Sequence, residues 1–195
     1  HTDFLSQIYP QAIMAFWSDR MKIALFSHHL PLKEALKRVK RERLKDFFLH
    51  LRHCLEKIQP ETFRFLVTGL NPHAGENGLL GSEEEKEIAP AVKEAQEQGV
   101  RISGPFPADV VFRNALNRPE TVVIGLYHDQ GLIPFKLEAF EKGVNLTLGL
   151  PFIRTSPVHG TAFDIAGKGI ASSQSMVEAI RLAYSLSQPL FQLSS

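Results

Sequence analysis

Cysteine is almost absent from this chain of 195 residues, because Cys54 is the single thiol and no disulfide can form within the chain. A reducing compartment is compatible with this composition, and no signal peptide is visible, so we expect a cytoplasmic protein. Long apolar runs are also lacking, which predicts no membrane-spanning segment. Neither charge dominates, since 22 Lys+Arg stand against 21 Asp+Glu. A net charge of +1 gives no electrostatic reason to expect nucleic acid as a partner.

Short apolar runs alternate with longer amphipathic segments along the chain. The runs predict buried strands over 21–27, 64–70, 121–126 and 144–150. The amphipathic segments predict helices over 2–17, 32–58 (one long or two consecutive helices), 82–98 and 175–187. This alternation predicts an α/β fold with a mixed, largely parallel sheet and helices on both faces. No repeat or linker is visible, so we expect residues 1–195 to form a single unit.

Three local features have simple structural interpretations. The acidic run from Glu83 to Glu85 is predicted to begin a helix, because carboxylates in a first turn complement the helix dipole. The stretch 33–45 is rich in Lys and Arg, which favours a solvated helix face over a binding patch for an acidic partner. His50 and His53 lack a third metal ligand nearby and are assigned to the surface. Cys54 lies among apolar residues, which predicts a buried, inert thiol.

Three predicted strands each run into a histidine. The first leads into Ser27-His28-His29, the second into Asn71-Pro72-His73 and the third into Tyr127-His128-Asp129. The carboxyl ends of parallel strands meet at one edge of an open α/β sheet, where ligands bind. Three imidazoles with an open position are typical of a catalytic transition metal. Strand position alone leaves scattered, hydrogen-bonded histidines as an equal alternative and does not decide between His28 and His29.

Longer motifs surround these histidines and follow one another along essentially the whole chain. They are His29-Leu30-Pro31-Leu32, Asn71-Pro72-His73-Ala74-Gly75-Glu76, Tyr127-His128-Asp129-Gln130-Gly131-Leu132, Gly143-Val144-Asn145-Leu146-Thr147-Leu148-Gly149-Leu150-Pro151-Phe152-Ile153-Arg154-Thr155-Ser156 and His159-Gly160-Thr161-Ala162. In order and spacing they resemble the 4-hydroxythreonine-4-phosphate dehydrogenase family of vitamin B6 biosynthesis. The motifs are long and specific, so the sequence is identified as similar to that family.

The resemblance implies a fold similar to isocitrate and isopropylmalate dehydrogenases, and a homodimer with its active site at the interface. It implies NAD- or NADP-linked oxidation of 4-phosphooxy-L-threonine to a β-keto acid, which decarboxylates to 3-amino-2-oxopropyl phosphate in pyridoxal phosphate biosynthesis. A divalent metal (Zn, Co, Mn or Mg) is implied as a cofactor. The N-terminal part of the family fold is absent here, and the chain begins at His1 rather than Met, so we interpret it as a fragment or a processed chain.

Site residues carry over from the resemblance position by position. The family's metal ligands fall on His29, His73 and His128, with one supplied across the dimer, and the match to His-Leu-Pro-Leu selects His29 over His28. Asp109 resembles a family aspartate near the reacting centre, which could transfer a proton or orient a ligand. The family's substrate contacts fall on His1, Thr2, Lys136, Asn145 and Arg154.

Some features leave alternatives open. Val158 stands where family members usually have an aspartate, so the function of that carboxylate is lost or replaced. No G-x-G-x-x-G motif follows a strand, so no ordinary Rossmann site is predicted and the cofactor-binding residues stay unassigned. The glycine-rich segment 75–81 is either a connecting loop or part of the cofactor site. The alternative functions are a relative's reaction, on 4-phospho-D-threonate or D-erythronate, and a truncated, non-catalytic metal-binding remnant.

Overall fold

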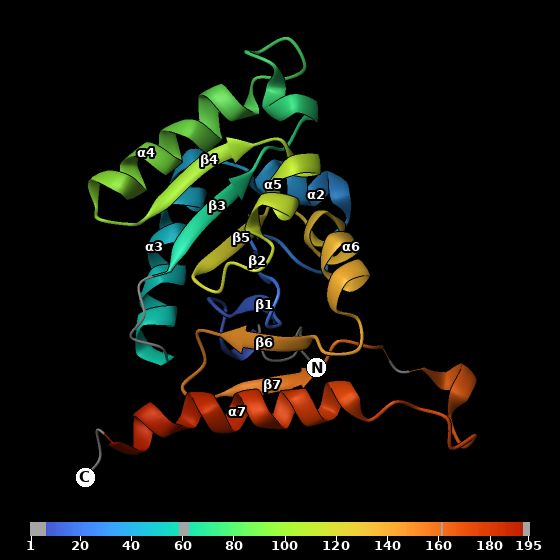
Figure 1. The fold of residues 1–195 in the computed structure, drawn as a ribbon. Coiled ribbons are helices and arrows are strands. Elements are labelled where there is room, and N and C mark those ends of the chain that lie inside the picture. The colour runs from blue at the N-terminus through green and yellow to red at the C-terminus, as the bar shows by residue number, and fades with distance from the viewer. Residues whose placement is uncertain (1–6, 59–62, 161, 193–195) are drawn as a thin grey trace.

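The computed structural model describes residues 7–58, 63–160 and 162–192. A seven-stranded sheet in the order β4-β3-β5-β2-β1-β6-β7 forms the centre of this part of the chain (Figure 1). The strands are β1 (Ile13–Trp17), β2 (Lys22–Leu25), β3 (Arg64–Thr68), β4 (Ile102–Phe106), β5 (Thr121–Gly125), β6 (Val144–Leu148) and β7 (Arg154–Pro157). The helices are α2 (Leu32–Arg38), α3 (Arg41–Ile58), α4 (Ala89–Glu97), α5 (Ala108–Ala115), α6 (His128–Ala139) and α7 (Gln174–Gln192), with short helical turns η1 (Pro72–Gly75), η2 (Glu84–Ile88) and η3 (Phe163–Ile165).

The strand directions make the sheet mixed and largely parallel, as predicted. Strands β4, β3, β5 and β2 pair with one another in parallel. Strand β1 is antiparallel to both β2 and β6, so β6 runs in the same direction as β2. Strand β7 is antiparallel to β6 and ends the sheet. The carboxyl ends of β4, β3, β5, β2 and β6 therefore lie along one edge.

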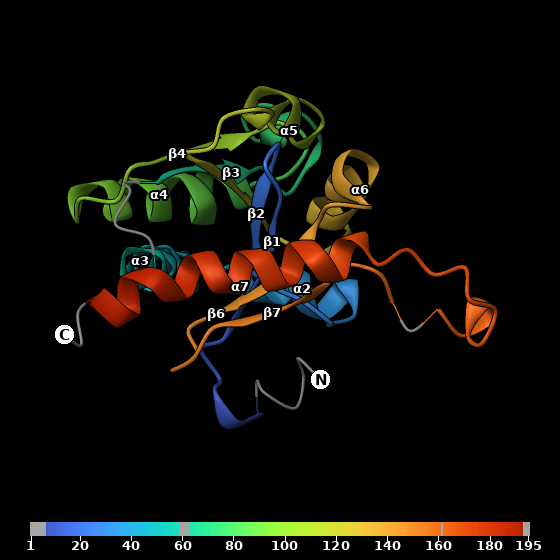
Figure 2. The same cartoon turned by 60° about the horizontal axis from the view of Figure 1, so that its bottom comes forward.

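Helices cover both faces of the sheet, which confirms the predicted layering (Figures 1 and 2). One core cluster joins α3, α4 and α7 to the face that carries Ala15, Ala24 and Ile124. The second cluster joins α5 and α6 to the opposite face, which carries Phe16 and Val123. Each face of the central strands is buried, and this explains why those strands are continuous apolar runs in the sequence.

The prediction of a helix over residues 2–17 was wrong from residue 9 onward, whereas Gln7 and Ile8 are helical. Residues 1–6 lie outside the described residues, and Ile13–Trp17 forms strand β1 with every side chain buried. A strand buried on both faces shows no alternation, so its spacing cannot be told from that of a buried helix. Strands β4 and β7 were not predicted. The edge strand β4 contains Gly104 and Pro105, and proline is tolerated in a sheet chiefly at such edges.

The basic stretch 33–45 lies on α2 and the first turns of α3. Several of its cations form ion pairs with nearby carboxylates, which favours the solvated helix face over a patch for an acidic partner. The pairs are Lys37–Glu34, Lys40–Glu87, Arg41–Glu94 and Lys45–Glu42. In the described part of the chain, no helix has the length and apolar character needed to cross a membrane.

Candidate active site

The three strands that precede the histidines are neighbours in the sheet. Strand β5 lies between β3 and β2, and all three are parallel, so their carboxyl ends are side by side. His29 follows β2, His73 lies in η1 after β3, and His128 is the first residue of α6 after β5. The three histidines therefore follow the carboxyl ends of three adjacent parallel strands.

His29 and His128 lie against each other at this edge. Their ring centroids are 5.6 Å apart, and the ring centroid of His28 lies 5.7 Å from that of His29. Two imidazoles that share one tetrahedral zinc, at Zn–N distances of about 2.0–2.1 Å, place their ring centroids about 5 Å apart. The ring of His128 also has Nδ1 2.7 Å from Asp129 Oδ1, which leaves Nε2 for a ligand. This donor pair fits a divalent transition metal.

His73 does not complete a triad within one chain. Among the described residues, no group of three His, Cys, Asp or Glu side chains is placed to hold a metal ion. The pair of imidazoles from β2 and α6 is thus an incomplete ligand set by itself. An arrangement in which one ligand comes from a second subunit is compatible with this geometry, because it requires only part of the set from each chain.

Two of the three histidines have a strained backbone. His29 has φ 47° and His73 has φ 52°, both in the left-handed region that non-glycine residues rarely adopt. Such conformations persist where the surrounding structure holds them, and they are enriched at functional sites. The surrounding structure therefore holds the turns after β2 and β3 in one conformation.

A buried hydrogen-bond network ties the carboxyl ends of β3 and β5 together, and sequence reasoning missed its function. Gln130 Oε1 accepts hydrogen bonds from the Leu126 N–H and from Thr68 Oγ1, both at 2.8 Å. Gln130 Nε2 donates to the Gly69 carbonyl at 2.7 Å. The Gln130 side-chain amide thus links the end of β3 to the end of β5. His73 and His128 lie in the segments that follow these two strand ends. The signal in the sequence was a polar residue inside the Tyr127–Leu132 motif.

The predicted substrate residues on β6 and β7 face the side of the sheet that α6 covers. Leu146 belongs to the opposite core cluster, so its neighbours Asn145 and Thr147 point to the α6 side. Arg154 pairs with Thr147 in the sheet, and its Nη1 donates to Thr147 Oγ1 at 2.7 Å. Asn145 Oδ1 is buried and has no hydrogen-bond partner among the described residues. A buried acceptor without a donor is costly, so this atom fits a ligand group.

The other predicted residues have simpler surroundings. His1 and Thr2 lie outside the described residues. Lys136 is exposed on α6, and Asp109 is exposed in the first turn of α5, which contacts η1. Val158 is buried, and its N–H donates to Ser175 Oγ at 3.1 Å. An apolar contact therefore occupies the position where the resemblance expected an aspartate.

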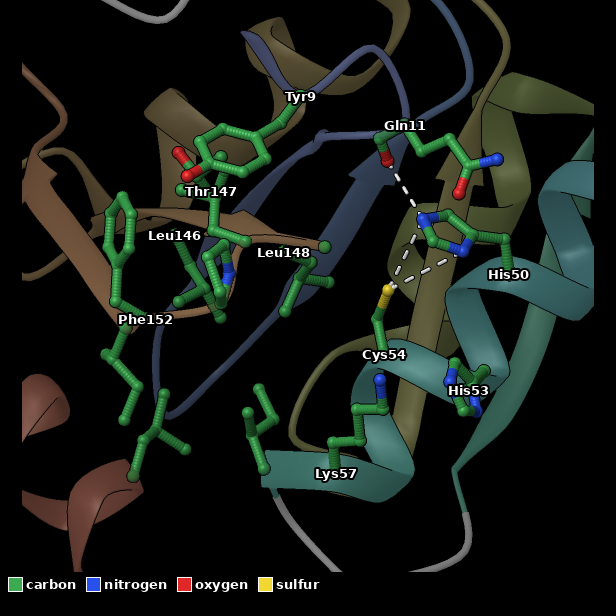
Figure 3. Close-up of a pocket in the computed structure, with 16 residues that line it drawn as sticks. Tyr9, Gln11, His50, His53, Cys54, Lys57, Leu146, Thr147, Leu148 and Phe152 are labelled. Atoms are coloured by element: carbon green, nitrogen blue, oxygen red, sulfur yellow. Dashed lines mark hydrogen bonds between the residues drawn. The ribbon is translucent and has the colours of Figure 1, made fainter. Parts of the chain in front are cut away.

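A pocket of about 610 Å³ lies on the other face of the sheet, between α3 and the β6–β7 connection (Figure 3). His50 Nε2 lies 2.9 Å from the Gln11 carbonyl and 3.5 Å from Cys54 Sγ. Burial raises the pKa of the Cys54 thiol to about 11, although the charge of Lys57 acts in the opposite direction. The prediction of a buried thiol is confirmed, and the histidine has a structural hydrogen bond. None of the predicted metal ligands lines this pocket.

A family model described as "Pyridoxal phosphate biosynthetic protein PdxA" matches residues 1–183. The chain belongs to the PdxA family. It is 51% identical over 170 residues to a 4-hydroxythreonine-4-phosphate dehydrogenase of Aquifex aeolicus, covering 87% of this chain and 52% of the relative. It is 48% identical over 185 residues to a putative D-threonate 4-phosphate dehydrogenase of Halalkalibacterium halodurans, covering 94% and 55%. The chain thus spans about half the length of these PdxA relatives.

Solved structures agree with this assignment. A 4-hydroxythreonine-4-phosphate dehydrogenase from Klebsiella pneumoniae superposes with a TM-score of 0.82 at 40% identity, covering 96% of this chain and 58% of that one. A β-decarboxylating dehydrogenase from Thermococcus kodakarensis, at 16% identity and a TM-score of 0.57, shares the fold alone. The expected isocitrate dehydrogenase-like architecture is therefore confirmed.

Proposed function

We propose that this chain carries part of the active site of a metal-dependent dehydrogenase that oxidises 4-phosphooxy-L-threonine, with NAD or NADP as the hydride acceptor. The product is a β-keto acid that loses carbon dioxide to give 3-amino-2-oxopropyl phosphate. The observation that carries the proposal is the ring contact between His29 and His128 at the ends of parallel strands, in a member of the PdxA family.

The ligands that we propose for the metal are His29, His73 and His128. A divalent metal held by these imidazoles would supply Lewis-acid activation of the substrate hydroxyl that is oxidised. Asp129 holds the ring of His128 through Nδ1 and thereby fixes the tautomer that presents Nε2. Asp109, beside η1, is our candidate for moving a proton at the reacting centre.

The phosphate and the remaining polar groups of the substrate need cationic and amide partners. Arg154 offers a planar fork of donors and is held in place by Thr147. Lys136 adds a point charge from α6, and the unpartnered Asn145 Oδ1 accepts a hydrogen bond from a substrate donor. These groups lie on β6, β7 and α6, on the same side of the sheet, which supports a single substrate site. His1 and Thr2 are further contacts by resemblance only.

A homodimer with a shared site is part of the proposal. Helix α6 leaves Ile133, Leu137 and Phe140 exposed at a spacing of four and three residues, which forms an apolar stripe. A second copy of the chain that covers this stripe would lie against the helix that begins at His128. The incomplete ligand set within one chain supports the same arrangement.

Reduction of NAD or NADP, followed at 340 nm with the complete natural protein, tests the proposal. We expect turnover of 4-phosphooxy-L-threonine, loss of activity with a chelator, and recovery with zinc, cobalt or manganese. Metal binding without any hydride transfer would instead support a non-catalytic remnant. A second candidate substrate is 4-phospho-D-threonate, because a relative at 48% identity has a name that specifies D-threonate 4-phosphate. Faster turnover of that compound would move the assignment within the PdxA family.

A further inference from the structure

Glu84 is a buried carboxylate that points away from solvent and into the turn before His73. It is 3% exposed, although it lies in the first turn of η2. Its Oε1 accepts hydrogen bonds from the N–H groups of Leu70 and Asn71, both at 2.7 Å, and its Oε2 accepts one from Asn71 Nδ2 at 3.0 Å. A buried carboxylate is tolerated only when its oxygens are paired in this way.

The turn that Glu84 holds has an unfavourable backbone. His73 and Ala74 each have φ 52°, Glu76 has φ 45° and Asn77 has φ 54°, so four non-glycine residues are left-handed within a short segment. A run of such residues is not stable by itself, because each places Cβ too close to a backbone oxygen. It persists only where neighbouring groups determine the conformation.

The glycines of the segment show that the chain is wrapped closely around this carboxylate. A Cβ on Gly75 would lie 2.7 Å from Glu84 Oε2, and a Cβ on Gly69 would lie 3.4 Å from Glu84 Oε1. A Cβ on Gly81 would collide with the Asn71 amide. The loop therefore has little freedom to adopt another shape while Glu84 occupies its centre.

We infer that Glu84 is the positioning residue for His73. By anchoring Leu70 and Asn71 it fixes the path of the strained turn, and through that turn it fixes the direction from which the imidazole approaches a metal. This inference rests on the proposed function, in which His73 is a metal ligand. A helix-dipole role, which suits the exposed Glu85 in the same turn, does not explain the three hydrogen bonds of Glu84.

The test uses Co²⁺ binding to the complete natural protein, followed by its visible absorption spectrum. The variants are Glu84→Gln, the matched control Glu85→Gln, and His73→Ala. In Glu84→Gln the amide oxygen can still accept from the Leu70 and Asn71 N–H groups, but the new NH2 group faces the Asn71 Nδ2 donor and the negative charge is lost, so the turn loses part of its anchor. We expect the Co²⁺ dissociation constant to rise about 10–100-fold and the spectrum to change, with no change in Glu85→Gln.

The outcomes separate this inference from the proposed function. If His73→Ala binds Co²⁺ as the natural protein does, His73 is not a ligand and the proposed site is wrong. If His73→Ala loses the ion but Glu84→Gln retains normal affinity and spectrum, the site stands and the positioning role is refuted. If Glu84→Gln does not fold, Asn71→Ala decides, since it keeps both backbone donors to Oε1 and removes the side-chain donor to Oε2, together with the hydrogen bond that the same amide donates to Glu83 Oε2 at 2.8 Å. It should weaken binding by about 10-fold, the lower end of the range expected for such partners, and unchanged affinity there would also refute the inference.

Discussion

Gly131 of α6 lies so close to Leu25 of β2 that a Cβ on the glycine would be 2.6 Å from Leu25 Cδ2. The helix that begins at His128 is therefore seated directly on the strand that leads to His29. We expect Gly131→Ala to destabilise the protein by about 1–3 kcal/mol through overpacking, as measured by urea unfolding. Either the Leu25 side chain or the helix must move to make room, and we expect the variant also to bind metal more weakly.

Gly160→Ala is the matched control for this substitution. A Cβ on Gly160 would have no neighbour within 4 Å, and its φ lies outside the left-handed region. We expect its unfolding free energy to stay within about 0.5 kcal/mol of the natural protein. Equal effects of the two alanines would show that the packing of Gly131 on Leu25 is not the cause.

Gln130 is buried, and it should contribute more to stability than the exposed Gln96. Gln130→Met leaves the Leu126 N–H and the Gly69 carbonyl without their buried partners, so we expect a loss of about 2–4 kcal/mol. Gln96 donates a single hydrogen bond, to the Ile102 carbonyl, and Gln96→Met should cost about 1 kcal/mol. Chemical denaturation of both variants checks the difference, and a smaller cost for Gln130→Met would contradict the importance of the network.

Mixed dimers test whether the metal ligands are shared between subunits. His29→Ala, His73→Ala and His128→Ala are each expected to be inactive, and the three pairwise mixtures are made by co-expression. If one ligand crosses the interface, two mixtures regain one intact site per mixed dimer, about a quarter of full activity after random pairing. The ring contact indicates that His29 and His128 act in the same site from one subunit. The mixture of His29→Ala with His128→Ala should therefore stay inactive. Failure of all three would show that each site is built by one subunit.

The Cys54 thiol should react only after unfolding. Burial raises its pKa from the ordinary value of 9.0 to about 11. At pH 8 about one molecule in a thousand then carries the reactive thiolate. A disulfide reagent should label the native protein slowly and the urea-unfolded chain at once. The unfolded chain also loses this proton first, so the unfolding free energy should fall between about pH 9 and 11, and Cys54→Ala should weaken that dependence.

Much of the fold could be predicted from the sequence because its strands are short, apolar and separated by clear helices. The strands over 64–70 and 121–126 were predicted in the correct places, and their parallel pairing follows from the intervening helices. Strand β1 was not predicted, because Ile13–Trp17 is buried on both faces and shows no alternation of apolar and polar residues. Strand β7 was missed because Arg154–Pro157 is polar and only partly buried. Edge strands of this kind have little hydrophobic signal.

The residues of the candidate site could be predicted from the sequence, but the residues that hold them in position could not. The position of His29 and His128 at neighbouring strand ends followed from the pattern of strands. The functions of Glu84 and Gln130 could not be predicted, because several of their partners are backbone groups of segments distant in the sequence. Glu84 resembles any first-turn carboxylate until the turn around it is known. Every residue has a backbone carbonyl, and every residue except proline has a backbone N–H. The amino-acid sequence therefore does not show which of these groups a side chain will contact.

The order of the strands also bears on how the chain folds during synthesis. Strands β1 and β2 form a local hairpin, yet its two outer edges are covered by β6 and β5, which come from the second half of the sequence. Until Gly125 and Leu148 have left the ribosome, an almost wholly apolar hairpin exposes unpaired edges on both sides. Nascent chains of this topology are prone to aggregate and fold slowly, so the yield of soluble protein should depend on chaperones and on growth temperature.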